Sequence, residues 1–257
     1  MSPRTVFITG ASSGFGAACA QQFAEAGDRL VLAARRLEPL LKLQGELQGQ
    51  AAGIHVIQLD VRDRQAVQDA VENLPQEFRE IDLLVNNAGL ALGLEPAHQA
   101  SLDDWETMVD TNIKGVMYCT RCILPGMVAR NRGHVINIGS TAGAWPYPGG
   151  NVYGGTKAFV EQFTRNLRAD LLGTMVRATC IAPGMAETEF SNVRFKGDEG
   201  KASKVYEGST PLTALDIANI VRWAADQPPH VNINTLEVMS IHQTWAPFAV
   251  HREANIK

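Results

Sequence analysis

Two residues that could move a proton lie four positions apart, Tyr153 and Lys157. Their segment has helical periodicity, and positions four apart share one face of a helix, so the ammonium can approach the phenol. A tyrosine with its ordinary pKa of about 10 is poorly poised at neutral pH. We expect the Lys157 cation to favour the phenolate and lower the pKa of Tyr153. The pair predicts proton transfer at a carbonyl or alcohol oxygen.

A serine precedes this pair at the end of an apolar run. Ser140 lies 13 positions before Tyr153 and follows residues 135–138. Its hydroxyl would orient the substrate and stabilise developing charge while Tyr153 transfers the proton. A Tyr/Lys pair at this spacing is common by chance and is usually a surface contact. Its chemical meaning therefore depends on a cofactor-binding motif upstream.

A glycine-rich turn follows the first apolar run and precedes a helical segment. It contains Gly10, Ser12, Ser13, Gly14, Phe15 and Gly16. Glycines let the backbone turn tightly and approach a pyrophosphate, and the next helix terminus offers N–H groups to the anion. A glycine trio alone is a weak signal, but here the required strand and helix flank it. The turn predicts a dinucleotide site, with an unliganded strand-to-helix turn as the alternative.

Two cations follow the second apolar run, where an NAD-specific enzyme usually carries a carboxylate. Arg35 lies 19 residues beyond Gly16, close to the spacing of the ribose-reading position, and Arg36 is next to it. Guanidinium groups pair well with a dianionic 2′-phosphate. We therefore expect NADP(H) as the cofactor, although two exposed arginines at the start of a helix are the alternative.

Two further strand ends fit a nucleotide groove. Asp60 and Val61 close the third apolar run and could meet the adenine edge; a helix N-cap explains Asp60 equally well. Asn87, Ala88 and Gly89 follow the fourth run, where small residues let a cofactor lie against the backbone.

The elements that position these residues alternate between short apolar runs and helical segments. About seven strands are predicted, around residues 6–8, 30–32, 56–59, 81–85, 135–138, 176–181 and 235–238. Apolar strands separated by helices indicate a parallel sheet covered on both faces. We predict an α/β fold, a Rossmann-type doubly wound parallel sheet, as a single domain over residues 1–257.

Composition narrows the possible partners and the compartment. The chain has 257 residues and a formal net charge of -4, which favours neither nucleic acid nor an acidic membrane. No leader or transmembrane-length apolar run is recognisable, so a cytoplasmic location is expected. We expect the four cysteines to be reduced thiols of the core: Cys19, Cys119, Cys122 and Cys180. The lone CxxC has no second ligand pair, so no metal site is expected.

Residues 191–208 depart from the alternating pattern. The segment is charged, punctuated by glycine and only weakly periodic. It stands between the last two predicted strands, beyond whose carboxyl ends ligands bind in such folds. It is either a substrate lid or a solvated surface loop.

The combined motifs resemble the short-chain dehydrogenase/reductase family over essentially the whole chain. They are residues 9–16, 86–89, Asn112, Ser140, Tyr153, Lys157 and Pro183–Gly184. The resemblance implies a catalytic tetrad of Asn112, Ser140, Tyr153 and Lys157, in which Asn112 supports a water-linked proton relay behind Lys157. It also implies that Tyr153 and Lys157 contact the cofactor, with Lys157 on the nicotinamide ribose. Further cofactor contacts are implied for Pro183, Gly184 and Thr188.

Three segments are similar to the NADP-dependent 3-hydroxy acid dehydrogenases of this family, at residues 192–198, 230–237 and 250–252. The resemblance implies oxidation of serine, allo-threonine and related 3-hydroxy acids, or reduction of malonic semialdehyde, by a homotetramer. Residues 145–148, 186–190 and 245–248 are also similar to sulfoacetaldehyde reductases. A general carbonyl reductase is a further alternative. A nucleotide-sensing scaffold is the non-enzyme alternative, but its usual mark is a broken Tyr/Lys pair.

A small hydroxy acid has little apolar surface, so a charged contact must orient it. Arg194 in the lid segment is the candidate, since a guanidinium grips a carboxylate with two hydrogen bonds; a surface cation is the alternative. Tyr147 and Phe248 are expected to wall the pocket, together with Ser140 and Tyr153 as substrate contacts. Phe248 lies in a C-terminal tail, residues 240–257, that either reaches a neighbouring subunit or packs on its own.

Overall fold

The computed structural model describes residues 3–245, and its centre is one parallel β-sheet. The strands are β1 (Thr5–Thr9), β2 (Arg29–Ala34), β3 (Gly53–Gln58), β4 (Ile81–Asn86), β5 (Gly133–Ile138), β6 (Val176–Pro183) and β7 (Thr235–Val238). Their order across the sheet is β3-β2-β1-β4-β5-β6-β7, and every pairing is parallel. The direction of winding reverses between β1 and β4. The predicted doubly wound fold is confirmed.

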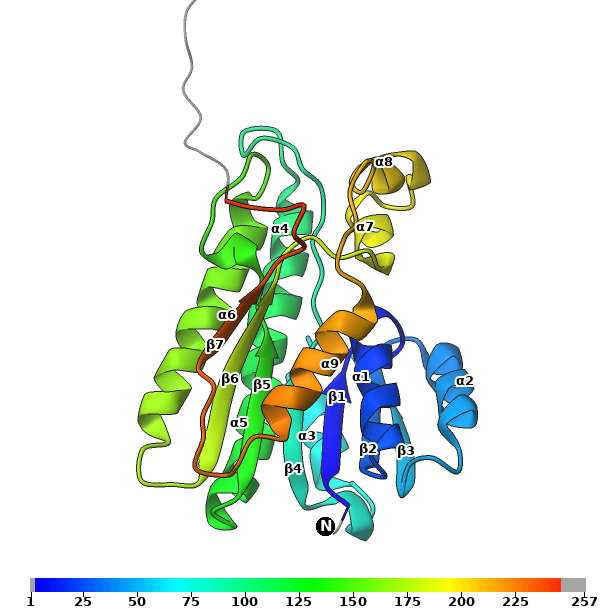
Figure 1. Ribbon diagram of the computed structural model, residues 1–257, viewed down its shortest axis with the longest axis vertical. Helices are drawn as coiled ribbons and strands as arrows, with labels where there is room; N and C mark the ends of the chain where they lie inside the picture. The colour runs from blue at the N-terminus through cyan, green and yellow to red at the C-terminus, as the bar shows by residue number, and fades with distance from the viewer. Residues whose placement is uncertain (1–2, 246–257) are drawn as a thin grey trace, which may run out of the picture.

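Helices cover both faces of this sheet (Figure 1). They are α1 (Gly14–Glu25), α2 (Leu37–Leu47), α3 (Arg64–Glu72), α4 (Leu102–Val109), α5 (Gly115–Ala129), α6 (Asn151–Asp170), α7 (Glu189–Arg194), α8 (Glu199–Lys204) and α9 (Ala214–Ala225). One apolar cluster joins α1, α2 and α9 to the sheet, and the other joins α3, α5 and α6 to the opposite face.

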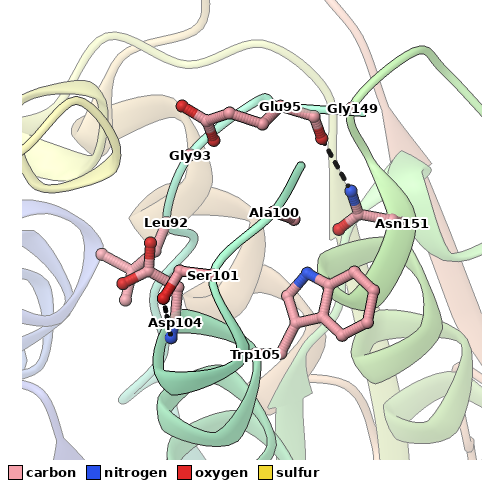
Figure 2. A pocket seen from close by; sticks show the side chains of 9 residues that line it. All are labelled: Leu92, Gly93, Glu95, Ala100, Ser101, Asp104, Trp105, Gly149 and Asn151. Carbon is pink, nitrogen blue, oxygen red and sulfur yellow. Dashed lines mark hydrogen bonds between the residues drawn. The ribbon is translucent and has the colours of Figure 1, made fainter. Parts of the chain in front are cut away.

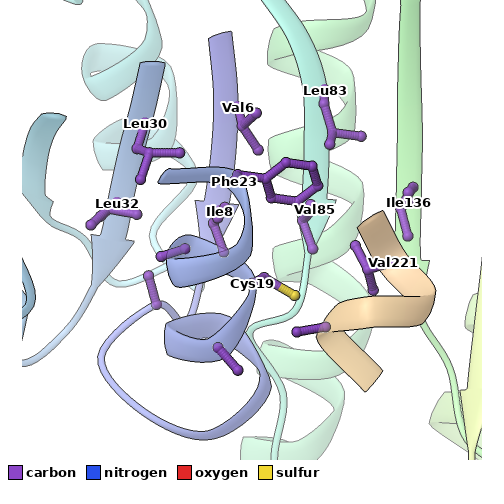
Figure 3. Packing of buried hydrophobic residues seen from close by; sticks show 14 of the residues in the cluster. Val6, Ile8, Cys19, Phe23, Leu30, Leu32, Leu83, Val85, Ile136 and Val221 are labelled. Carbon is purple, nitrogen blue, oxygen red and sulfur yellow. The ribbon is translucent and has the colours of Figure 1, made fainter. Parts of the chain in front are cut away.

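Alternation along the strands assigns side chains to these two clusters. Val6 and Ile8 of β1 point to the α1 side, whereas Phe7 between them points to the α5 side. Figure 3 shows Phe23 of α1 over β1 and β4, and Val221 of α9 beside β4 and β5. Since the central strands are buried on both faces, their sequences are continuous apolar runs.

The segment at 191–208 contains two short helices, which its weak periodicity did not reveal. Helix α7 begins earlier, at Glu189, and is capped by Thr188, whose hydroxyl accepts the Phe190 N–H. With α8 it lies at the end of the molecule toward which β1 points (Figure 1). Among residues 3–245 no helix is both long and apolar enough to cross a membrane.

Candidate active site

A cavity of about 810 Å³ lies beyond the carboxyl ends of the strands. Its lining includes residues that follow β1, β2, β3, β4, β5 and β6, and α7 borders it from the lid side. The glycine turn, the arginine pair and the Tyr/Lys pair all line this one cavity, as a doubly wound sheet places them. Widely separated predicted motifs are therefore parts of one site.

The glycine turn has glycines where other residues would not fit. Gly10 and Gly14 have φ of 66° and 54°, values that L side chains rarely adopt. A Cβ on Gly16 would stand 2.3 Å from the Gly10 carbonyl oxygen, so this glycine allows α1 to pack against the end of β1. Gly16 is buried beneath the turn, whereas Gly10, Ser12, Ser13, Gly14 and Phe15 line the cavity.

The two arginines after β2 lie at the mouth of the cavity and are exposed. Arg36 Nη2 lies 3.4 Å from Ser12 Oγ and 3.2 Å from Ser13 Oγ in the glycine turn. The same nitrogen donates to Glu189 Oε2 at 2.9 Å. These groups already hold a carboxylate, so they fit a bound phosphate as well.

Asp60 lines the cavity but is not a helix N-cap. Asp63 caps α3, accepting the N–H groups of Gln65 and Ala66. Asp60 instead pairs with Arg62, whose Nε lies 2.9 Å from Asp60 Oδ2, and this pair lowers the pKa of the Asp60 carboxyl. The N-cap alternative for Asp60 is therefore wrong, since the N-cap residue lies three positions later.

Val61, Asn87, Ala88 and Gly89 line the middle of the cavity. Asn87 Nδ2 donates to the carbonyls of Thr9 and Gly10, at 3.0 and 3.1 Å, and so ties the end of β4 to the glycine turn. A Cβ on Gly89 would lie 3.2 Å from Asn112 Oδ1 and 3.5 Å from Lys157 Nζ.

Tyr153 and Lys157 are both buried on one face of α6. Lys157 Nζ lies 5.9 Å from the centroid of the Tyr153 ring and donates to the Ile138 carbonyl at 2.8 Å. Ser140 caps the short 3-10 helix Thr141–Gly143, accepting the Ala142 N–H at 3.1 Å.

Burial governs the protonation of this pair. It raises the pKa of Tyr153 to about 12, against smaller lowering effects of the Ser140 hydroxyl and the Arg194 cation. It also lowers the pKa of Lys157 to about 8. Our expectation that Lys157 lowers the pKa of Tyr153 is thus wrong for the chain by itself. Both ions lose solvation in the same enclosed site.

Asn112 lies in a π-helical turn, Asp110–Lys114, between α4 and α5. Its side chain is buried, and both its oxygen and its nitrogen form hydrogen bonds. Oδ1 accepts the Leu90 N–H at 2.9 Å, and Nδ2 donates to the Leu90 carbonyl at 2.8 Å and to Thr156 Oγ1 at 3.0 Å. These bonds fix the loop after β4 against α6, and single π turns are frequent at functional sites.

Arg194 lies directly over the tyrosine, enclosed by aromatic rings. Its guanidinium carbon is 5.1 Å from the ring centroids of Tyr153 and Phe190 and 5.8 Å from that of Tyr147. Arg194 Nη2 donates to Tyr147 Oη at 2.9 Å. Its Nε is buried and has no hydrogen-bond partner among the described residues. The surface-cation alternative for Arg194 does not describe this position.

The end of α7 is held in place by the loop after β4 and by α4. The Gly93 N–H donates to the Arg194 carbonyl at 3.0 Å, and Lys196 Nζ lies 2.8 Å from Asp104 Oδ2. Figure 2 shows Gly93 and Asp104 around a small hollow in which Asn151 of α6 donates to the Glu95 carbonyl. These contacts position Arg194 within the described structure.

Pro183, Gly184 and Thr188 also line the cavity, as does Tyr147. Phe248 lies outside the described residues. Sequence reasoning missed Phe190 as a wall of the arginine enclosure and Gln243, whose Oε1 accepts the Met185 N–H at 2.7 Å. No local sequence pattern reveals Phe190 or Gln243, because α7 is short and Gln243 stands in an irregular segment.

Comparison with known proteins agrees with this geometry. The family profile of the short chain dehydrogenases matches residues 4–199. The chain belongs to this family.

Its similar relatives include an NADP-dependent 3-hydroxy acid dehydrogenase from Salmonella typhi, 58% identical over 96% of this chain and 99% of the relative. A protein from Chromohalobacter salexigens, named sulfoacetaldehyde reductase 2, is 52% identical over 96% of this chain and 98% of its own. A solved closed form of serine dehydrogenase complexed with NADP+ is 56% identical, with a TM-score of 0.94, over 96% of this chain and 99% of the other. The fold of the short-chain dehydrogenases thus extends over nearly the whole chain.

Proposed function

We propose that the protein is an NADP(H)-dependent dehydrogenase that interconverts a small 3-hydroxy acid and its semialdehyde or 3-keto acid. The observation that carries this proposal is the Arg194 guanidinium, 5.1 Å from the centroid of the Tyr153 ring, because a cation there would hold the acid group of a substrate beside the proposed proton donor. The names of the relatives from Salmonella typhi and of the serine dehydrogenase structure support the same substrate class and cofactor.

The cofactor lies across the carboxyl ends of the strands in this proposal. The glycine turn and the start of α1 face its pyrophosphate, Arg35 and Arg36 take the 2′-phosphate, and Asp60 and Val61 border the adenine. At the other end, Lys157 holds the nicotinamide ribose. Smaller groups along the groove lie against the cofactor: Asn87, Ala88, Gly89, Pro183, Gly184 and Thr188.

The bound nicotinamide supplies or accepts the hydride. Tyr153 donates a proton to the substrate oxygen during reduction and removes it during oxidation. The Ser140 hydroxyl donates a hydrogen bond to the same oxygen. Asn112, which holds the loop at Leu90 against α6, supports the path that returns a proton to Lys157 and Tyr153.

The acid group of the substrate binds Arg194. An unpaired buried donor is costly, and a substrate oxygen at Arg194 Nε would supply the missing partner. Tyr147 holds the other side of the guanidinium and so orients it. The carbonyl carbon is thereby directed toward the nicotinamide.

A substrate panel tests this proposal. We expect reduction of NADP+ with 3-hydroxypropionate, L-serine and L-allo-threonine, and oxidation of NADPH with malonic semialdehyde, followed by nicotinamide absorbance. Sulfoacetaldehyde is the second candidate, because a guanidinium also binds sulfonate and one relative carries that name. A sulfonate preferred by a wide margin would replace the carboxylic acid in the proposal.

Replacing Arg194 separates the anion contact from the chemistry. Arg194→Ala is expected to lower kcat/KM for an acidic substrate by about 10²-fold, the effect of about 3 kcal/mol of a charge-assisted contact, and to affect neutral carbonyls little. Arg121→Ala, on the exposed surface of α5, removes the same charge as a control. Equal losses for acidic and neutral substrates would contradict an anion site at Arg194.

We also propose a cytoplasmic homotetramer. The family resemblance supports the assembly, and four free cysteines, three of them buried, support a reducing compartment. Light scattering of the purified protein measures the mass, and a monomer at micromolar concentration would refute the tetramer.

A further inference from the structure

Arg36 and Glu189 connect two parts of the site that are 153 residues apart in the chain. Arg36 follows β2, and Glu189 is the first residue of α7. The Glu189 carboxylate lies 2.9 Å from Arg36 Nη2, the nitrogen that also lies within 3.4 Å of Ser12 and Ser13. One guanidinium nitrogen thus faces a carboxylate and two hydroxyls of the glycine turn.

The surroundings of Glu189 are those of a bound anion. The hydrogen bond from Arg36 is the main reason that the pKa of the Glu189 carboxyl lies below its usual value, and Ser13 adds to it. Thr188, which caps the start of α7, lies near the turn, since its side chain is 3.5 Å from the position that a Cβ on Gly14 would take. The carboxylate therefore stands where positive charge and hydroxyl donors converge.

We propose that Glu189 competes with the 2′-phosphate of the cofactor for Arg36 and so tunes the preference for NADP(H) over NAD(H). The inference rests on the proposed role of Arg36 as the 2′-phosphate contact. A carboxylate and a dianionic phosphate at one guanidinium repel each other, so binding of the phosphate displaces Glu189. NAD(H) carries no 2′-phosphate and leaves the Arg36–Glu189 pair intact.

The Arg36–Glu189 ion pair is weak, so its removal is expected to change the affinity for a 2′-phosphate only modestly. The side chains of Arg36 and Glu189 are 55% and 54% exposed, and such pairs contribute little. Removal of Glu189 is therefore expected to tighten binding of a 2′-phosphate about two- to fivefold. The effect should decrease with rising salt concentration.

Nucleotide fragments isolate this end of the site from the chemistry. We would measure, by calorimetry at low ionic strength, the Kd of adenosine 2′,5′-bisphosphate and of AMP for the full-length protein. Glu189→Gln is expected to bind the bisphosphate about two- to fivefold more tightly and AMP unchanged. Glu187→Gln, two residues earlier and exposed, makes the same change of charge and should match the wild type.

The Arg36→Ala background distinguishes competition for Arg36 from a general electrostatic effect of the Glu189 charge on the bound nucleotide. If Glu189 acts through Arg36, the gain from Glu189→Gln disappears in the double variant. A gain that persists there, or a Glu189→Gln variant that binds the bisphosphate no better than the wild type, overturns the inference. Separately, an Arg36→Ala variant with an unchanged Kd for the bisphosphate would overturn the proposed role of Arg36 itself.

Discussion

Tyr153 and Lys157 lie on one face of α6, yet burial disfavours the ionised form of each. A phenol with a raised pKa stays protonated at neutral pH and is ready to donate to a carbonyl oxygen. For the reverse reaction a phenolate is needed; the Arg194 cation already acts to lower the pKa of Tyr153, and an oxidised nicotinamide would favour the phenolate further when bound. The protein alone therefore favours the protonation state required for reduction.

Tyr153→Phe removes the transferable proton and little else. Turnover in both directions is expected to fall by about 10²- to 10⁴-fold, while the Kd of NADPH, measured by fluorescence, stays unchanged. Tyr118→Phe on α5 is the matched control, because its hydroxyl has no hydrogen bond to a described residue. Turnover of Tyr153→Phe close to that of the wild type would remove Tyr153 from the chemistry.

Lys157 is expected to lower the stability of the fold. Its folded-state pKa of about 8 lies below the ordinary 10.5, so burial of the cation destabilises the protein most below pH 8. Lys157→Met should raise the free energy of unfolding at pH 7 by on the order of 1–2 kcal/mol, after loss of the hydrogen bond to Ile138.

The gain in the free energy of unfolding that we expect from Lys157→Met depends on pH. Between about pH 8 and 10.5 the unfolded chain binds a proton at Lys157 that the folded chain does not, so the wild type gains stability as the pH rises. The difference between the two proteins in urea unfolding should shrink over this range. A difference independent of pH would show that the lysine is not a buried cation.

At the scale of elements, the glycine turn and α7 act differently on the site. The turn depends on close backbone packing between β1 and α1, whereas α7 is six residues long and depends on its contacts. Its C-terminal end is held by Arg194, which bonds Tyr147 and Gly93, whereas the exposed Glu189–Arg36 pair at its start adds little. A helix this short is not stable alone, so these tertiary contacts determine its position.

Gly16→Ala tests the packing of the turn. Its Cβ would stand 2.3 Å from a backbone oxygen, so α1 must shift, and we expect a loss of about 1–3 kcal/mol in stability and weaker binding of NADPH. Gly45→Ala in α2 is the control, since its Cβ meets no atom within 4 Å. That variant should be neutral or more stable by about 0.5–1 kcal/mol. Equal behaviour of the two variants in urea unfolding would contradict the packing argument.

Across the whole molecule, the cavity bridges both halves of the sheet around the reversal between β1 and β4. The arginines and Asp60 stand over β2 and β3, whereas Tyr153, Lys157 and Ser140 gather at β5 and β6. A dinucleotide in this cavity contacts both halves at once. Its binding free energy therefore adds to the stability of the complete fold.

NADP+ should accordingly protect the protein against unfolding. At about 100 times its Kd, the ligand is expected to add about 2.7 kcal/mol, measured as a rise in the urea midpoint or in Tm. NAD+ at the same concentration should protect less, because the 2′-phosphate contact is missing. Equal protection by the two cofactors would contradict the preference for NADP(H).

Local rules were sufficient for the glycine turn, the Tyr153–Lys157 pair and the order of strands and helices. Positive φ, close helix–strand packing and the four-residue helical repeat act over a few residues, so the sequence by itself determines them. The contacts between charged groups in the site could not be predicted by such local rules. Arg194 over Tyr153 and Glu189 on Arg36 join residues far apart in the chain, and the raised pKa of Tyr153 comes from burial by the surrounding fold. Only the tertiary structure decided these features, because distance and desolvation between remote segments leave no periodic trace in the sequence.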